Sequence, residues 1–220
     1  MEKQHEAPIV ICLCSDDNGV DFMLVAIKSI FITNKAENID LHIFTDGFSQ
    51  NNITLINKLA DYYNRSIKIH VIDEMEYNNL PGCGDGYHFP KSILFRFSIP
   101  EILTDYNKAL YLDTDIIVEH SLRELWNTDI TDNSIACVID AGITEFWDYI
   151  KYGLGFNPTR YFNSGVILMN LDYIREHNVK DCCLQWLIEN PEKSKWADQT
   201  SPNFMLEGTS NISILSIMFS

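Results

Sequence analysis

Basic residues are scarce in this chain, which carries 16 lysines and arginines against 31 aspartates and glutamates, for a formal net charge of −15. Proteins that bind nucleic acid neutralise its phosphates with clustered lysines and arginines, so the composition excludes nucleic acid as an expected partner. An acidic protein that handles anionic small molecules has to recruit positive charge locally, from a few basic side chains or from a bound cation. The charge balance therefore makes metal ligands the first feature to seek.

Long apolar runs and paired cysteines are also lacking. No stretch approaches the roughly 20 apolar residues that cross a bilayer, and the start MEKQHEAPIV lacks the regions of a signal peptide, so we expect a cytoplasmic protein without a membrane span. None of the six cysteines forms a C-x-x-C pair, and Cys83 and His88 share a polar loop without a second pair of soft ligands. We therefore predict reduced, mostly buried cysteines rather than a zinc site.

Two common phosphate-binding patterns are missing as well. The pattern G-x-x-x-x-G-K-[ST] does not occur, and the glycines in the polar loop at 76–91 neither follow a strand nor open a helix. These observations disfavour P-loop proteins and dinucleotide-binding Rossmann proteins.

Apolar runs alternate with helical spacings along the chain. We predict strands at 8–13, 41–45, 67–72, 109–112, 116–118, 135–139 and 165–171, and helices at 20–31, 53–63, 92–99 and 179–189. Ser49 is the expected N-cap of the second helix. This alternation implies one α/β domain over residues 1–220, with a Rossmann-like, mainly parallel sheet flanked by helices. Such sheets bind ligands at the carboxyl ends of their strands, where the polar loop 15–18 follows the first strand.

Two carboxylates stand between apolar runs in the segment KALYLDTDIIV, which contains Asp113 and Asp115. In an extended segment their side chains point to the same face, and burying both without a counter-ion is costly. Mg²⁺ or Mn²⁺ takes one or two carboxylates, completes its shell with water and phosphate oxygens, and acts as a Lewis acid on a leaving diphosphate. A D-x-D can also be a simple turn, but the apolar runs on both sides favour a metal site.

With its neighbours included, KALYLDTDIIV closely resembles the D-x-D segment of glycosyltransferase family 8. Further stretches fit the same family, namely CSDDNGVDFMLVAIKSI, SILFRFSIPEIL, IACVID, YFNSGVILMNL and KWADQTSPNF. The resemblance implies a GT-A fold and a retaining transferase that uses Mn²⁺ or Mg²⁺. It also implies a UDP-sugar as the donor and a saccharide or glycan as the acceptor, such as lipopolysaccharide or another cell-surface glycan.

The resemblance further implies which residues contact the donor. In this interpretation Asp16 and Asn18 contact the base or ribose, and Arg96 reaches the diphosphate or the sugar. Asp140 and Asn163 hydrogen-bond sugar hydroxyls. The full implied donor-binding set is Asp16, Asn18, Arg96, Asp113, Thr114, Asp115, Asp140, Asn163 and Ser164. Purely structural alternatives stay open: Asp16 as a helix cap, Arg96 in a surface salt bridge, and Asn163 in a turn.

The pair Asp198 and Gln199 matches the family residues beside the anomeric carbon, where a retaining enzyme stabilises developing positive charge. Gln199 is assigned the side nearest C1. Because a neutral amide is a poor nucleophile, we favour same-face attack, in which the leaving phosphate accepts the proton, over a covalent intermediate.

The sequence after Gln199 departs from the family pattern, and Thr200 stands where an acidic residue is usual. Family members continue to a later segment with a metal-binding histidine and with a glycine and lysine that hold the diphosphate. None of the six histidines takes that position, so Asp113 and Asp115 would share the metal with phosphate oxygens and water. We therefore expect weaker metal binding and weakened or absent transferase activity from these 220 residues, while peripheral membrane contact of a full-length protein and the oligomeric state stay open.

Two other classes of protein compete with the transferase. A haloacid-dehalogenase-like phosphohydrolase would use a D-x-D as nucleophile and general acid with Mg²⁺, but that family places it after the first strand and needs a later lysine and acidic pair. After the transferase and the phosphohydrolase, the third hypothesis is a catalytically silent module that binds a nucleotide sugar. Calorimetry with UDP-sugars and Mn²⁺, together with a transfer assay, separates all three.

Overall fold

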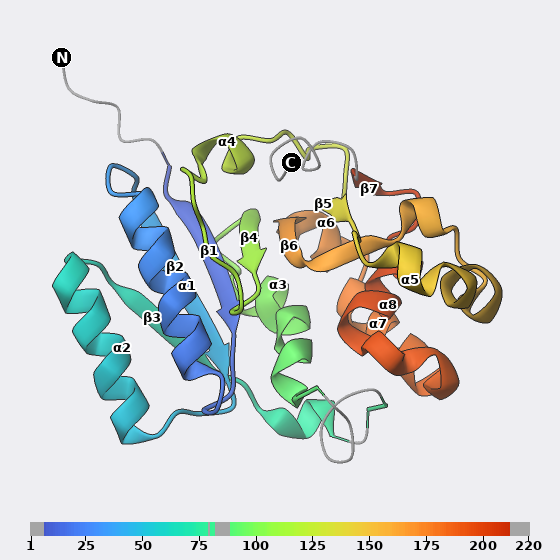
Figure 1. The fold of residues 1–220 in the computed structure, drawn as a ribbon, viewed down its shortest axis with the longest axis horizontal. Helices are drawn as coiled ribbons and strands as arrows, with labels where there is room; N and C mark the ends of the chain where they lie inside the picture. Colours follow the sequence, from blue (N-terminus) through green and yellow to red (C-terminus); the bar gives the residue numbers. More distant parts are fainter. Residues whose placement is uncertain (1–6, 79, 82–88, 212–220) are drawn as a thin grey trace.

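The computed structural model describes residues 7–78, 80–81 and 89–211, in which strands alternate with helices (Figure 1). The strands are β1 (Ile9–Cys14), β2 (Ile39–Thr45), β3 (Ile67–Val71), β4 (Lys108–Leu112), β5 (Ile135–Ile139), β6 (Phe162–Asn170) and β7 (Ser210–Asn211). The longer helices are α1 (Val20–Thr33), α2 (Gln50–Tyr63) and α7 (Val179–Glu189). The shorter helical segments are η1 (Glu74–Tyr77), η2 (Lys91–Ser98), α3 (Ile99–Ile102), α4 (Arg123–Trp126), α5 (Ile143–Asp148), η3 (Tyr149–Leu154), η4 (Pro158–Arg160), α6 (Leu171–Glu176), η5 (Pro191–Trp196) and α8 (Ala197–Met205).

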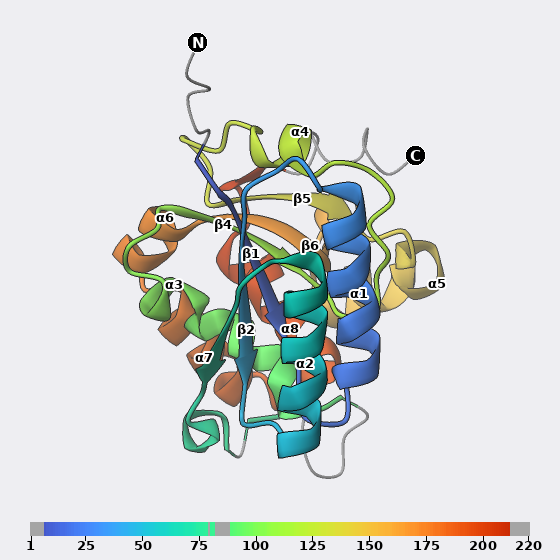
Figure 2. The same cartoon turned by 90° about the vertical axis from the view of Figure 1, so that its left-hand side faces the viewer.

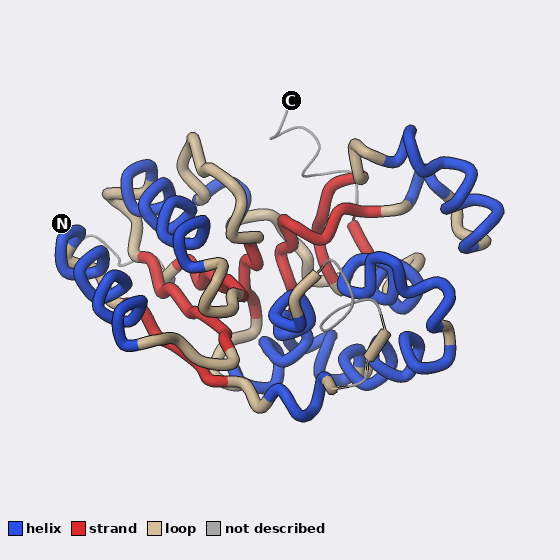
Figure 3. The backbone as a smooth tube through the Cα atoms, turned by 60° about the horizontal axis from the view of Figure 1, so that its bottom comes forward, coloured by secondary structure: helices blue, strands red, loops and turns tan. Residues whose placement is uncertain are grey.

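The described strands form one sheet in the order β3-β2-β1-β4-β6-β5-β7. Its first four strands are parallel, β6 runs antiparallel to both of its neighbours, and β7 is parallel to β5. Figure 2 shows α1 and α2 on one side of the strands and α3, α6 and α7 on the other, and Figure 3 shows the strands between the two groups of helices. The predicted α/β class with a mainly parallel sheet is therefore confirmed.

Burial explains why the central elements form where their patterns predict them. All six residues of β1 are buried, because neighbouring strands and helices on both faces enclose it, which is why it is a continuous apolar run. The inner side of α1 presents apolar residues such as Met23, Ile27 and Ile30 to the same core. At the start of α2, the Ser49 side chain accepts a hydrogen bond from the Asn52 N–H, which confirms the predicted N-cap.

The predicted strand at 116–118 is wrong. These residues pair with no strand; instead they run beside α1, where the N–H of Val118 donates to Ser29 Oγ at 2.9 Å. The apolar run therefore reflects packing of Val118, which is buried, while Ile117 stays exposed. Similarly, β6 begins at Phe162 rather than at 165, because residues 162 and 163 also pair with β5.

The cysteines behave largely as their distribution predicts. Cys12, Cys14, Cys137 and Cys183 are free and buried, and Cys182 is free and exposed. Burial raises the pKa of the Cys137 and Cys183 thiols to about 12, which keeps them protonated and unreactive. Cys83 and His88 lie outside the described residues. Among the described residues, no helix combines the length and the apolar character that a membrane crossing requires.

Candidate active site

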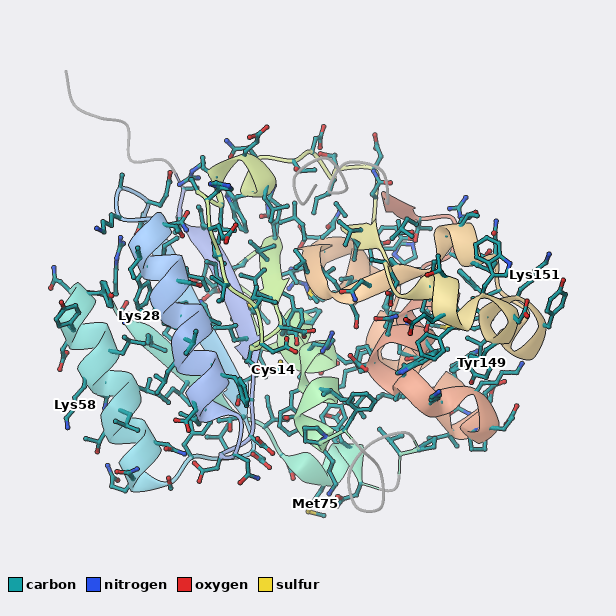
Figure 4. All side chains as sticks on the ribbon, viewed as in Figure 1. Cys14, Lys28, Lys58, Met75, Tyr149 and Lys151 are labelled. Carbon is teal, nitrogen blue, oxygen red and sulfur yellow. The ribbon has the colours of Figure 1, made fainter. Side chains whose placement is uncertain are left out.

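A cavity of about 630 Å³ opens where β1 and β4 end side by side in the sheet. Because the two strands are parallel, the polar residues that follow them meet at the same edge. Figure 4 places Cys14, the last residue of β1, near the middle of the molecule, between the N-terminal and the C-terminal helices. Of the residues proposed from sequence, those that line the cavity are Asp16, Arg96, Asp113, Thr114, Asp115, Ser164, Asp198 and Gln199.

Asp113 and Asp115 follow β4 in a turn, not in the extended segment that the sequence predicts. The N–H of Asp113 still donates to the carbonyl of Gly165 on β6 at 2.8 Å, and Thr114 and Asp115 then leave the sheet in a turn. Both carboxylates nevertheless line the cavity. The turn, rather than the two-residue period of a strand, therefore brings them to one place.

Arg96 is a buried residue of the cavity wall that contacts several other residues. Its guanidinium lies 3.1 Å from Asp113 Oδ1 and 3.0 Å from Asp198 Oδ2, and it donates to the Ser164 carbonyl at 2.7 Å. Its Nε donates to the Ile93 carbonyl at 2.8 Å, within the helical segment η2 that carries it. The interpretation as a surface salt bridge is therefore wrong, because only 3% of this side chain is exposed. Arg96 instead joins Asp113, which follows β4, to Asp198 in the first turn of α8.

The charges of this cluster oppose one another. Burial raises the pKa of Asp198, the positive charge of Arg96 opposes that rise, and the carboxylate of Asp113 adds to it. The guanidinium also lies over the ring of Tyr111, with its carbon 4.3 Å from the ring centroid. Arg96 therefore compensates for two nearby carboxylates whose mutual repulsion would otherwise strain the site.

The two carboxylate oxygens of Asp113 have different surroundings. Oδ1 accepts hydrogen bonds from the Tyr111 hydroxyl at 2.7 Å and from Arg96. Oδ2 faces Gly165, and a Cβ added to that glycine would lie only 2.6 Å from this oxygen. Asp115 is exposed and has no hydrogen-bond or ion-pair partner among residues 7–78, 80–81 and 89–211. One oxygen of Asp113 and the whole carboxylate of Asp115 are thus available to a ligand.

These oxygens suit a hard divalent cation only if a ligand completes the shell. Among the described residues, no group of three or more His, Cys, Asp or Glu side chains could hold a metal ion. Mg²⁺ and Mn²⁺ accept one or two carboxylates when phosphate oxygens and water supply the remaining positions. Asp113 and Asp115 therefore fit a cation that is shared with a phosphate-bearing ligand.

Gln199 lies in the first turn of α8 with both ends of its amide held. Its Nε2 donates to Asp140 Oδ2 at 2.6 Å, and its Oε1 accepts from the Ser164 N–H at 3.2 Å. Since one partner is an acceptor and the other a donor, the network fixes the orientation of the amide. The Ser164 hydroxyl also donates to Asp198 Oδ2 at 3.2 Å. Asp140 does not line the main cavity but, with Gln199, lines a smaller neighbouring one.

The remaining proposed residues have local contacts. Asp16 Oδ1 accepts a hydrogen bond from the Gly19 N–H at 2.8 Å, so Asp16 supports the start of α1 and also lines the cavity. Asn18 is exposed and donates to Asp16 Oδ2 at 3.4 Å. Asn163 Oδ1 accepts from the Gly165 N–H at 2.8 Å. Neither Asn18 nor Asn163 is part of the described cavity lining.

Four aromatic residues of the cavity are not predicted from sequence. Tyr111, Phe22, Phe89 and Trp196 all line it. For Tyr111 a signal was present, because a residue two positions before Asp113 in a strand points to the same face. Phe22, Phe89 and Trp196 carry no local signal, since an aromatic residue in an amphipathic helix, at the end of a loop or before Asp198 is equally typical of a core.

Comparison of the fold places the chain among the GT-A glycosyltransferases. The galactosyltransferase LgtC, solved in complex with donor and acceptor sugar analogues, matches with a TM-score of 0.84 and 25% sequence identity, over 96% of this chain and 79% of that one. The sequence pattern described as Glycosyl transferase family 8 matches residues 10–219, and the chain belongs to this family.

Two curated relatives are also glycosyltransferases. The lipopolysaccharide glucosyltransferase WaaO of Escherichia coli is 33% identical over 66% of this chain and 43% of its own length. The lipopolysaccharide 1,3-galactosyltransferase of Salmonella typhimurium is 29% identical over 76% of this chain and 50% of its own length. The chain thus spans about half the length of these relatives.

Proposed function

We propose that this chain transfers a hexose from a UDP-sugar to a saccharide or glycan acceptor, with retention of the anomeric configuration. The observation that carries the proposal is the cavity in which the D-x-D carboxylates, the Arg96–Asp198 pair and Gln199 meet. Membership of family 8 supports it and speaks against the phosphohydrolase. The lipopolysaccharide hexosyltransferases among the relatives favour a cell-surface glycan as the acceptor.

We assign Asp113 Oδ2 and Asp115 as the protein ligands of a divalent cation, Mn²⁺ or Mg²⁺. Such a cation would act as a Lewis acid on the diphosphate of the donor. Arg96 holds Asp113 through its other oxygen and so sets the direction in which Oδ2 points. In a chain with a net charge of −15, this cation would supply the positive charge that an anionic donor needs.

We assign the residues around Gln199 to the sugar of the donor. The fixed amide of Gln199, held by Asp140 and Ser164, presents its remaining N–H at a set position, and Asp198 supplies negative charge next to it. A carboxylate near the anomeric carbon stabilises positive charge as the C1–O bond to the diphosphate breaks. In the same-face reaction the acceptor oxygen bonds C1, and its proton passes to the leaving phosphate.

Titration calorimetry and a transfer assay test this function. We expect UDP-glucose or UDP-galactose to bind in the presence of Mn²⁺, EDTA to abolish that binding, and a saccharide acceptor to be glycosylated slowly, in keeping with the weakened activity expected from the sequence. Binding without any transfer would favour the silent module, and phosphate release from a phosphomonoester without UDP-sugar binding would favour the phosphohydrolase. A donor-sugar adduct on Asp198 or Gln199, found by mass spectrometry, would contradict same-face attack.

Replacing Gly165 by alanine should weaken metal-dependent binding of UDP about 10- to 100-fold, the range seen when support of a metal ligand is lost. The added Cβ would lie 2.6 Å from Asp113 Oδ2 and would displace the proposed ligand atom. Calorimetry with UDP and Mn²⁺ measures the change. Gly208→Ala is the control, because its φ of +86° makes that substitution strained at a place outside the cavity lining. Equal UDP affinity in Gly165→Ala and the unaltered chain would contradict the assignment of Oδ2.

A further inference from the structure

Three aromatic rings cluster beside the donor cavity. Phe146 of α5, Tyr149 of η3 and Trp196 of η5 come from segments about fifty residues apart in sequence. The ring centroids of Phe146 and Trp196 are 4.7 Å apart at 72°, and those of Tyr149 and Trp196 are 5.7 Å apart at 83°. Both contacts are edge-to-face, the arrangement that aromatic rings prefer. The cluster is therefore a packed unit, although Phe146 remains 36% exposed.

Lys195 lies over this cluster. Its Nζ is 4.7 Å from the ring centroid of Trp196, 5.1 Å from that of Phe146 and 5.9 Å from that of Tyr149. The side chain is exposed, and within the described part of the chain it forms no ion pair. Three rings restrict where the ammonium group can go, so it would lose little freedom when it binds an anion.

A second cavity, of about 150 Å³, opens against two of these rings, those of Phe146 and Trp196. Phe146, Trp196, Asp140 and Gln199 are among the residues that line it. Trp196 and Gln199 also line the donor cavity, so the two cavities adjoin at the amide proposed to lie beside C1. A molecule in the second cavity would therefore lie next to the reacting carbon of the donor, which is where an acceptor must be.

We propose that this second cavity binds the acceptor saccharide and selects one that carries an anionic group, a phosphate or a carboxylate, which Lys195 binds. The inference rests on the proposed transferase function. The exposed face of Phe146 and the ring of Trp196 offer apolar surface to a sugar ring, and Asp140 offers hydrogen-bond acceptors to its hydroxyls. Lys195 supplies the charge that distinguishes an anionic sugar from a neutral one.

The surrounding charge makes a local contact necessary for this selection. Glu192 lies close enough that its charge, after burial as the larger cause, raises the pKa of Tyr149. Together with the net charge of −15, this acidic neighbour repels anions at long range. Selectivity for an anionic acceptor must therefore come from direct contact with Lys195 and not from electrostatic steering.

Three probes that differ only at C6 test the proposal on the full chain: methyl α-glucoside, methyl α-glucuronide and methyl α-glucoside 6-phosphate. Ligand-observed NMR titration in the presence of UDP and the diamagnetic cation Mg²⁺ gives the three affinities. We expect at least one anionic probe to bind about two- to fivefold more tightly than the neutral one, in line with one partly exposed ion pair. The glucuronide and the phosphate distinguish a carboxylate from a phosphate as the preferred group.

Lys195→Gln should reduce that preference to about onefold and leave UDP affinity unchanged. Lys151→Gln is the matched control, because Lys151 also lies over a tyrosine ring, at 5.1 Å from that of Tyr152, but points away from the molecule in Figure 4. This control should keep the preference. Tyr149, in contrast, lies between α5–η3 and the C-terminal helices in the same view.

The possible failures are distinguishable. Equal or undetectable binding of all three probes by a chain that binds UDP would overturn the inference alone. A preference that survives Lys195→Gln would also overturn it, and so would a loss of UDP affinity in that variant, because Lys195 would then serve the donor. Failure of UDP-sugars to bind at all would refute the proposed function, whatever the probes do.

Discussion

Replacing Arg96 by methionine should destabilise the native protein by about 3 kcal/mol, the lower end of the range for breaking a buried ion pair. Methionine keeps much of the volume of the side chain but leaves Asp113 and Asp198 without their counter-charge. The lower end applies because 34% of the Asp113 side chain is exposed, so water can solvate part of its charge, whereas only 15% of Asp198 is exposed. Urea unfolding at neutral pH measures the change in the free energy of unfolding.

A second substitution separates loss of charge from loss of packing. If the uncompensated carboxylate of Asp198 causes the instability, Arg96→Met combined with Asp198→Asn should recover about half of the lost free energy, because an amide costs far less to bury than a carboxylate. Asp198→Asn alone is the reference for the cycle. A double variant no more stable than Arg96→Met would show that the guanidinium acts mainly through its hydrogen bonds to the Ile93 and Ser164 carbonyls.

The pH dependence gives an independent check of the same prediction. Burial raises the pKa of Asp198 and Arg96 opposes the rise, so removal of Arg96 raises this pKa further. The pKa of this carboxyl is then higher in the native chain than in the unfolded chain, where it is about 3.9. Such a group contributes stability at a pH below its unfolded pKa, and this contribution is lost as the pH rises through its native pKa. The deficit of Arg96→Met relative to the unaltered chain should therefore shrink as the pH falls from neutral.

The sequence predicts those parts of the fold that depend on local patterns. The strand at 135–139 and the helix at 179–189 have the predicted bounds, because the continuous apolar run of the strand and the helical spacing of apolar residues in the helix both coincide with buried positions. The pattern fails at 116–118, where the apolar run is equally compatible with packing beside a helix. No local signal separates these two outcomes, since burial by α1 depends on residues almost ninety positions away.

In the candidate site, too, the sequence predicts some features and not others. The residue types of the site follow from the sequence and from the family resemblance, as do the positions of Asp16, Asp113 and Asp115 after strands. Eight of the proposed residues line one cavity. The hydrogen-bond and ion-pair partners of these residues do not follow from the sequence. The sequence suggests a donor contact or a surface salt bridge for Arg96, yet this residue pairs with Asp113 and with Asp198, the latter more than a hundred residues further along. Such pairings are set by tertiary packing and cannot be derived from periodicity or motif spacing.

Replacing Asp115 by asparagine should lower the rate of sugar transfer at least about 100-fold, because a cation that polarises the leaving group contributes several kcal/mol to the transition state. Asparagine has the same shape but lacks the charge that a divalent cation prefers. UDP affinity in the presence of Mn²⁺ should fall together with the rate, while the free energy of unfolding should not change. Calorimetry, a transfer assay and urea unfolding measure the three quantities.

Of the two carboxylates, Asp115 is better suited to this test, because its substitution changes fewer other contacts. Asp113 also accepts from Tyr111 and pairs with Arg96, so changing it would disturb the cavity wall as well as the cation. Asp105→Asn is the matched control, because Asp105 is likewise an exposed aspartate in a turn, but it precedes β4 and lies at the opposite end of the strand. If Asp115→Asn binds UDP with Mn²⁺ as tightly as Asp105→Asn does, the cation is not held by the D-x-D turn, and the donor charge must be met by Arg96 or by another cation of the chain.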